Sequence, residues 1–191
     1  MAYKIIQAKK DLKDLVLGQY VNIQKPDTYD GAVYKFDTTL TGAVADKLAA
    51  AVDTTLLSGA ADIGAKPSNK RPYKRQDDGS VIFAFKIKEF EEGKRPFKLW
   101  DMKMKPILDV PNLTGGTVLN VNFAFYISEY KGTAFIALQP THCQVKHAEV
   151  YEGGDNGPTF GEGEGGYEQE EGSPNFDESD TSGSTPPDND F

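Results

Sequence analysis

The last 43 residues, Glu149 to Phe191, place the strongest limit on what this chain can fold into. They contain 13 Asp and Glu residues and no Lys or Arg. They have a single Val and no Leu or Ile, and nine Gly and four Pro interrupt them. Such a segment cannot bury enough apolar surface to offset the entropy lost on ordering. We therefore predict that residues 149–191 form a disordered acidic tail.

The charge of the chain divides at the same point. The whole sequence has 21 basic and 29 acidic residues, a net charge of −8, whereas residues 1–148 have 21 basic and 16 acidic residues, a net charge of +5. A polyanion tethered to a basic body can compete with nucleic acid for a binding groove, or present its charged tip to partners. A tail that only improves solubility is the third interpretation, although it would gain nothing from the aromatic Phe191 at its end.

The body before the tail, residues 1–148, is long enough for one domain with its own hydrophobic core. The single cysteine, Cys143, excludes an internal disulfide framework and fits a reducing compartment. The N-terminus has no apolar run of signal-peptide length, and no segment has the length and hydrophobicity of a membrane span. These features predict a soluble cytoplasmic protein that does not contact a membrane.

Alternation of apolar and polar residues predicts a mainly β domain of five or six short strands. The expected strands are residues 15–25, 32–38, 80–88, 97–104, 117–127 and 133–146. The period changes between Thr41 and Leu57, where apolar residues recur every four positions, so one helix should follow the second strand, capped by Thr41 and ended by Gly59. Short strands separated by Gly and Pro suggest a small barrel or sandwich, and we favour a five-stranded OB-fold barrel with one inserted helix.

The sequence offers little for catalysis. Its two histidines, His142 and His147, lie in or near the last expected strand, and Cys143 adjoins His142. Neighbours in a strand point to opposite faces, so His142 and Cys143 should not form a catalytic dyad. No zinc-protease, redox, nucleophile-elbow or phosphate-loop motif is present. We expect a protein that is not an enzyme and needs no cofactor or metal.

Nucleic-acid binding is better supported, because some aromatic residues fall on the polar side of their strands. Sequence-tolerant binding of single strands needs a positive groove and aromatic faces on which bases stack. Tyr20, Trp100 and Tyr126 lie in phase with Asn, Gln or Lys, so we predict that they stack on bases. The alternative is that they cap the ends of a barrel or lie in a subunit contact. Four phenylalanines share the apolar phase and should be core, namely Phe83, Phe85, Phe123 and Phe125.

Basic residues concentrate in the middle third of the chain. The segment 66–75 is the densest part, with five basic residues and one Tyr in ten positions. An ordinary solvated face is rarely so dense, so we predict contacts with nucleic-acid phosphates. The full set of expected contacts is Lys70, Arg71, Tyr73, Lys74, Arg75, Lys86, Lys88, Lys98, Lys103, Lys105 and Lys131. This pattern does not separate DNA from RNA.

Three stretches together resemble a known family. A basic loop meets a strand in PYKRQDDGSVIFAFK at 72–86, LWDMKMKPI follows at 99–107, and GGTVLNVNFAFY at 115–126 leads into KGTAFIALQ at 131–139. With the acidic tail and its terminal Phe, this arrangement resembles the single-stranded DNA-binding proteins of tailed bacteriophages, of the OB-fold type. The stretches and the tail span most of the chain, and the resemblance lies in their arrangement more than in any single motif.

The resemblance implies a protein that coats single-stranded DNA during phage replication, recombination and repair, in the cytoplasm of the infected bacterial host. It also implies that the tip of the tail, with Asp188, Asp190 and Phe191, contacts replication proteins such as the phage DNA polymerase and helicase-primase. Whether the protein forms a homodimer stays open. An RNA-binding OB-fold protein remains an alternative. A phage protein that uses its acidity to bind a host enzyme is a second one, against which the basic body argues.

Overall fold

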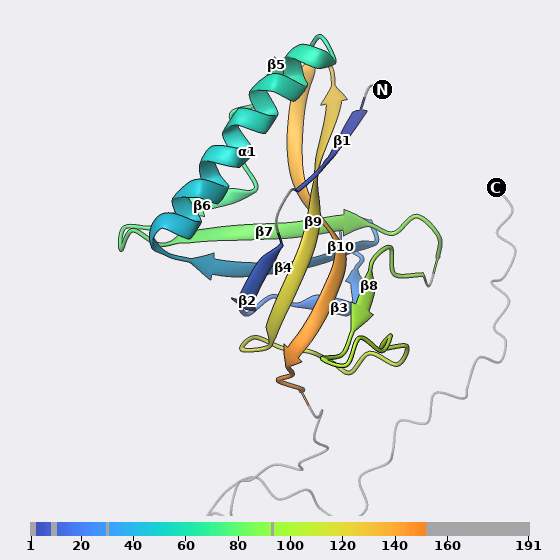
Figure 1. Ribbon diagram of the computed structural model, residues 1–191. Helices are drawn as coiled ribbons and strands as arrows, with labels where there is room; N and C mark the ends of the chain where they lie inside the picture. The colour runs from blue at the N-terminus through green and yellow to red at the C-terminus, as the bar shows by residue number, and fades with distance from the viewer. Residues whose placement is uncertain (1–2, 9–10, 30, 93, 152–191) are drawn as a thin grey trace, which may run out of the picture. The chain divides into compact units, whose positions relative to one another are not determined.

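The computed structural model describes residues 3–8, 11–29, 31–92 and 94–151, and the predicted tail beyond Tyr151 lies outside them. This part of the chain is mainly β and contains one helix, α1 (Gly42–Asp62) (Figure 1). The strands are β1 (Tyr3–Gln7), β2 (Leu12–Val16), β3 (Asn22–Asp27), β4 (Val33–Leu40), β5 (Lys66–Pro67), β6 (Tyr73–Arg75), β7 (Val81–Lys88), β8 (Lys98–Trp100), β9 (Val118–Tyr130) and β10 (Thr133–His147). No helix in these residues is long and apolar enough to cross a membrane.

Five long segments of the sheet build the barrel that the sequence predicts. Hydrogen-bonded neighbours run β3, β4, β7, β10, β9 and β2, and β2 and β3 are successive pieces of one broken strand. All these pairs are antiparallel except β7 with β10, which meet in parallel at Phe85 and Leu138. The ladder does not close fully, and one bridge between Leu17 and Thr38 spans the gap. The result is the partly open barrel of an OB-fold.

The first barrel strand breaks at Gly18, where the sequence predicts an uninterrupted strand over 15–25. The Gly18 amide donates to the Asp37 carbonyl oxygen at 2.9 Å, and a side chain at Gly18 would clash with the Asp37 carboxylate. The chain therefore crosses closely over β4 before it continues as β3. The long strands β4, β7, β9 and β10 confirm the expected ranges, whereas β8 occupies only Lys98–Trp100 of the expected strand 97–104 because the chain turns at Asp101. The sequence reading missed β1 and the short strands β5 and β6.

Helix α1 begins where the sequence predicts but extends past the expected end. Thr41 is its N-cap residue, but the Thr41 side chain makes no capping hydrogen bond, and the helix runs through Gly59 to Asp62. Gly59 is buried against β9, where a side chain would clash with Ile127, so it permits close packing and does not end the helix. Leu48 belongs to the buried side as expected, whereas Val44 is 54% exposed. Alanines complete the buried side, because the helix approaches the barrel closely.

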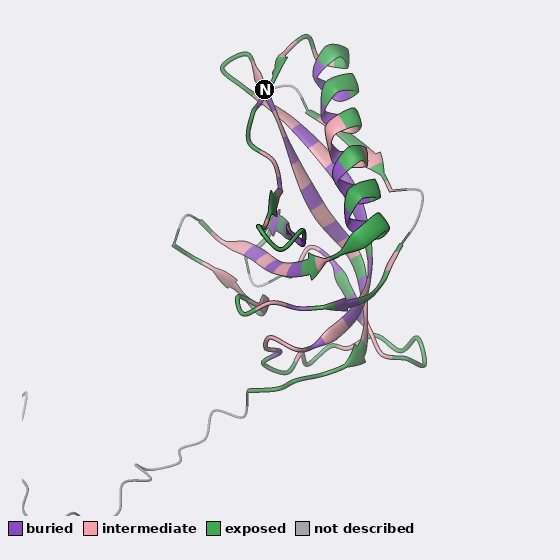
Figure 2. Cartoon of the chain, turned by 90° about the vertical axis from the view of Figure 1, so that its left-hand side faces the viewer, coloured by how far each residue is buried: buried purple, intermediate pink, exposed green. Residues whose placement is uncertain are grey.

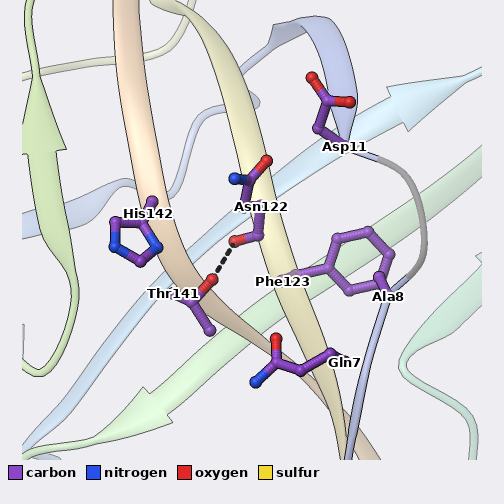
Figure 3. Close-up of a pocket in the computed structure, with 7 residues that line it drawn as sticks. All are labelled: Gln7, Ala8, Asp11, Asn122, Phe123, Thr141 and His142. Carbon is purple, nitrogen blue, oxygen red and sulfur yellow. Dashed lines mark hydrogen bonds between the residues drawn. The ribbon is translucent and has the colours of Figure 1, made fainter. Parts of the chain in front are cut away.

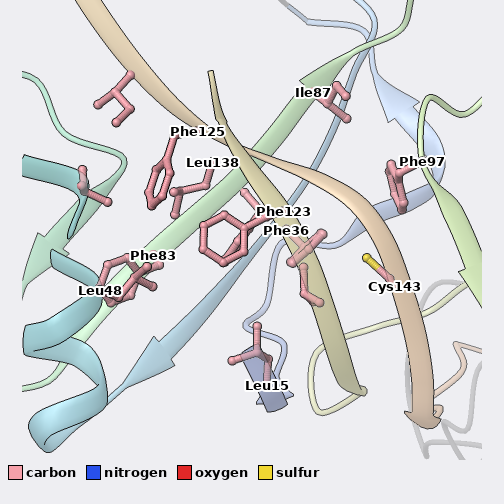
Figure 4. Packing of buried hydrophobic residues seen from close by; sticks show 14 of the residues in the cluster. Leu15, Phe36, Leu48, Phe83, Ile87, Phe97, Phe123, Phe125, Leu138 and Cys143 are labelled. Atoms are coloured by element: carbon pink, nitrogen blue, oxygen red, sulfur yellow. The ribbon is translucent and has the colours of Figure 1, made fainter. Parts of the chain in front are cut away.

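The core confirms the expected split between the two sides of each strand (Figures 2 and 4). Phe36 and Phe85 stack with ring centroids 5.1 Å apart, and Phe85 meets Phe123 edge-on at 5.6 Å. Phe83 is fully buried, and Phe125 packs edge-on against Phe123 at 5.3 Å. Burial of such aromatic pairs stabilises the barrel beyond the area they remove from water.

The first residues of the predicted tail are joined to the body. Thr114 donates its amide to the Glu149 carbonyl oxygen at 2.8 Å, and the Tyr151 amide donates to the Asn112 carbonyl oxygen at 3.0 Å. The ordered body therefore continues at least to Tyr151. The predicted division of the chain after residue 148 stays a prediction.

Candidate nucleic-acid interface

The outward sides of β8, β9 and β10 form one surface, which we call the tryptophan face. In β8, which runs parallel to β10, Lys98 lies beside His142 and Trp100 beside Gln144. In β9, Asn120 lies opposite Gln144. Residues paired in this way share a side of the sheet, so the tryptophan face consists of Lys98, Trp100, Asn120, His142 and Gln144. Trp100 is half-buried, and Lys98 is exposed.

Hydrogen bonds fix the amides of the tryptophan face. The Asn120 amide nitrogen donates to Gln144 Oε1 at 2.9 Å, and Asn120 Oδ1 accepts from the Asp14 amide at 3.0 Å. The Gln144 amide nitrogen donates to the Asp101 carbonyl oxygen at 3.3 Å. The surface beside Trp100 is therefore held in one arrangement before any ligand binds, which lowers the cost of binding.

A groove begins at Trp100 and crosses the sheet. Its first part is lined by Trp100, Met104 and Asn120, and its second part by Gln7, Ala8 and Thr141 (Figure 3). Both parts share three lining residues, namely Asp11, Asn122 and His142. The groove is lined by the amides of Gln7, Asn120 and Asn122 and by the hydroxyl of Thr141, together with two charged residues, Asp11 and Lys13. The amides and the hydroxyl suit hydrogen bonds to bases or sugars.

Lys103 and Lys105 lie on a tight turn that follows β8. One carboxylate oxygen of Asp101 accepts the backbone amides of both lysines, each at 2.8 Å. The turn closes because the Asp101 amide donates to the Lys105 carbonyl oxygen at 2.9 Å. Both lysines are exposed beside Trp100 along the chain, so this part of the predicted site is brought together.

A second basic surface, which we call the lysine face, lies on the outward sides of β4 and β7. It contains Lys86 and Lys88, both exposed, and Lys35, which lies opposite Lys86. Like charges directly opposite each other destabilise a sheet. Lys35 forms an ion pair with Asp27, whereas no described carboxylate pairs with Lys86 or Lys88. The unpaired lysines are available to an anionic ligand.

The basic segment 66–75 divides into free and engaged side chains. The Arg71 guanidinium and the Tyr73 hydroxyl both donate to the Asp53 carboxylate of α1, and Arg75 pairs with Asp46 at 3.0 Å. Burial pushes the pKa of Asp53 upward, but the hydrogen bonds from Arg71 and Tyr73 outweigh it, so the net pKa is lowered. Three residues of the segment, Lys66, Lys70 and Lys74, are exposed with no described ion pair.

Tyr73 also packs against the core, with its ring centroid 5.6 Å from that of Phe83. The geometry therefore gives Arg71 and Tyr73 a part in holding α1 against the barrel. The predicted contacts of these residues with nucleic acid stay predictions.

The remaining predicted residues, Tyr20, Tyr126 and Lys131, lie outside β8 and the turn that follows it. Tyr20 is 73% exposed at the break in the first strand. Tyr126 stacks on Tyr3 of β1, with ring centroids 6.0 Å apart, so one of its faces is already covered. Lys131 lies at the β9–β10 turn, over the Tyr130 ring. Since β9 rises by about 3.4 Å per residue, this turn is roughly 35 Å along the sheet from Trp100.

The structure thus gathers one group of predicted residues around Trp100 and another on β7. Sequence reasoning missed His142 and Gln144 as members of the tryptophan face. The alternation in the sequence predicts that both side chains lie on the outward side of β10. Their position beside β8 depends on the parallel pairing of β8 with β10, which no local sequence pattern predicts. The predicted tail residues Asp188, Asp190 and Phe191 lie outside the described residues.

His142 and Cys143 point to opposite sides of β10, as predicted. His142 is exposed and Cys143 is fully buried. Burial raises the pKa of the Cys143 thiol, so the thiolate needed for nucleophilic attack is disfavoured. Within the ranges that the structure describes, no three His, Cys, Asp or Glu residues cluster as a metal site would require.

Comparison with known proteins gives matches in structure and none in sequence. No protein-family model matches the chain, and no curated protein matches its sequence. The fold is similar to the crystal structure of gp2.5, a single-stranded DNA-binding protein encoded by bacteriophage T7. The TM-score is 0.57 at 21% identity, over 81% of this chain and 92% of that one.

Two structures of the single-stranded DNA-binding protein from bacteriophage Enc34 are also similar. Its complex with single-stranded DNA has a TM-score of 0.53 at 14% identity, over 76% of this chain and 97% of that one. Its C-terminal truncation has a TM-score of 0.53 at 12% identity, over 78% and 98%. The chain described here therefore has the fold of the single-stranded DNA-binding proteins of bacteriophages T7 and Enc34.

Proposed function

We propose that this protein binds single-stranded DNA without strong sequence preference. The observation that carries the proposal is Trp100, which stands on an exposed sheet face between Lys98 and a groove lined with amides, on an OB barrel. A base can stack on the indole, and the lysines can follow the backbone. The Enc34 protein of the same fold was solved in complex with single-stranded DNA, which supports the proposal.

The lysine face supplies part of the phosphate contacts. Lys86 and Lys88 are exposed and have no described ion pair, so a phosphate replaces water there without breaking a salt bridge. Lys98, Lys103 and Lys105 continue the positive charge beside Trp100. Contacts of this type carry no sequence information and weaken as salt rises, because binding releases condensed counterions.

We further propose that the protein coats single strands during replication, recombination and repair of phage DNA, in the cytoplasm of the infected host. In this proposal the acidic tail competes with DNA for the basic faces, and its tip recruits replication proteins such as the polymerase and helicase-primase. The support is the charge division between tail and body, and the terminal Phe191.

A titration of fluorescent oligo-dT, oligo-U and duplex DNA with the full-length protein tests the binding proposal. We expect oligo-dT to bind more tightly than duplex DNA, to quench the emission of the single Trp, and to dissociate as salt rises. Tighter binding of oligo-U than oligo-dT would instead make RNA the ligand. If the protein bound neither oligo-dT nor oligo-U, the proposal would be wrong.

A further inference from the structure

The segment that joins β7 to β8, described at residues 89–92 and 94–97, connects the lysine face to the tryptophan face along the chain. Lys88 ends β7 and Lys98 begins β8. Strand β9 pairs along the whole length of β10, so β7 and β8 both occupy the other edge of β10 in succession. A DNA strand that contacts both faces in succession along this edge of β10 passes close to this segment.

Arg95 is held in a fixed position within the segment. Its Nε donates to the Phe97 carbonyl oxygen at 3.1 Å, and the guanidinium carbon lies 5.5 Å from the centroid of the Phe97 ring. The Phe97 ring is 3% exposed and packs edge-on against Tyr34 at 6.0 Å. The guanidinium thus rests on a rigid aromatic base, and its terminal nitrogens make no hydrogen bond within the described chain.

The electrostatic setting of Arg95 differs from that of the other two arginines. Arg71 pairs with Asp53 and Arg75 with Asp46. Among the described residues, no carboxylate lies within ion-pair distance of Arg95. Two acids of the same segment have other partners, because Glu91 pairs with Lys94 at 2.6 Å and Glu89 interacts with the Tyr34 hydroxyl. The third acid, Glu92, is exposed and forms no ion pair with a described residue.

The partial burial of the Arg95 guanidinium without an anionic partner indicates a site for an anionic ligand. Burial is the main influence on the Arg95 guanidinium and lowers its pKa, although an arginine stays charged at neutral pH. A half-buried cation without an anionic partner loses solvation, and the Phe97 carbonyl and ring restore only part of it. A ligand that brings a negative charge would recover part of that free energy.

We propose that Arg95 is a phosphate clamp, whose terminal nitrogens donate to a backbone phosphate of the single strand where it passes from the lysine face to the tryptophan face. The planar guanidinium presents two parallel N–H donors, which match two phosphate oxygens. The clamp rests on the proposed binding of single-stranded DNA and adds one phosphate contact at a fixed place along the strand.

The test compares three variants of the full-length protein for binding to fluorescent oligo-dT over a series of salt concentrations. R95M removes the charge but keeps an apolar stem against Phe97, and R95K keeps the charge but removes the planar fork. K47M is the control, because Lys47 is an exposed residue of α1 and loses the same single charge. Thermal unfolding without DNA reports whether each variant keeps its fold.

We expect R95M to bind about tenfold more weakly at low salt. Its plot of log affinity against log salt should be shallower by roughly 0.7, the value for one phosphate contact to a single strand. R95K should keep the wild-type slope but bind more weakly than the wild type, because a lysine cannot make two parallel hydrogen bonds. K47M should behave as the wild type in both affinity and slope.

Wild-type affinity and slope in a folded R95M would overturn the clamp. Should R95M fail to fold, R95K decides, since wild-type affinity in R95K would show that the fork is not used. Failure of the proposed function looks different, because then the wild-type protein itself would not bind oligo-dT and its Trp emission would not change.

Discussion

Replacement of Trp100 by alanine is the sharpest test of the tryptophan face. Stacking of one base on an aromatic side chain is worth about 1–3 kcal/mol, so W100A should weaken binding of oligo-dT by about 5- to 150-fold. The fold should survive, because Leu99, and not Trp100, is the residue of β8 that enters the core, with 1% of its surface exposed. For the half-buried indole we expect a stability loss of about 2 kcal/mol, below the 3–5 kcal/mol of a fully buried aromatic.

Fluorescence anisotropy of labelled oligo-dT measures the affinity of each variant, and thermal unfolding measures its stability. W100F keeps an aromatic face and should recover part of the lost affinity, which a loss of packing alone does not predict. Y151A serves as the control, because Tyr151 is 62% exposed and is not a residue of the tryptophan face. In the wild type, oligo-dT should quench the emission of Trp100, the single Trp of the chain.

Two results would refute the assignment of Trp100. The first is that W100A remains folded and binds oligo-dT as tightly as the wild type. The other is a blue-shifted wild-type emission that does not respond to DNA, together with unfolding of W100A, which would make Trp100 a core residue.

Three further predictions concern the basic segment, the α1 anchor and the tail. The double variant K70A/K74A should flatten the salt dependence of binding by roughly 1.4, and an unchanged slope would move the phosphate contacts elsewhere. The lowered pKa of Asp53 means that its carboxylate stabilises the fold at neutral pH and that this stability is lost as pH falls below about 4. D53N should therefore unfold more easily than the wild type at pH 7 in denaturant titrations, with the difference shrinking at pH 3. Deletion of residues 152–191 should tighten binding to oligo-dT, most of all at low salt, and equal affinity after this deletion would refute competition by the tail. Deletion of Phe191 alone should leave the affinity for oligo-dT unchanged and weaken binding to a replication partner.

The sequence by itself determined which residues form the core and the order of the main elements. In β7 every second residue from Val81 to Ile87 is buried, and in β9 every second residue from Leu119 to Ile127 is buried, with Ala124 buried in addition. The spacing of apolar residues and the order of the elements can be read directly from the sequence, so both can be predicted without knowledge of the tertiary structure. The helix after the second strand and the outward position of Trp100 followed from the same local rule.

Tertiary structure decided where elements end and which side chains meet. Gly59 looked like a helix end, but α1 continues through it because the missing side chain lets the helix approach Ile127. Arg71 looked like a phosphate contact, and only the position of α1 shows that Asp53 engages it. The parallel pairing of β8 with β10, which places Trp100 beside Gln144, joins segments more than 40 residues apart. Such contacts depend on the path of the whole chain, because a local sequence pattern specifies the face on which a side chain lies and not the partner across from it.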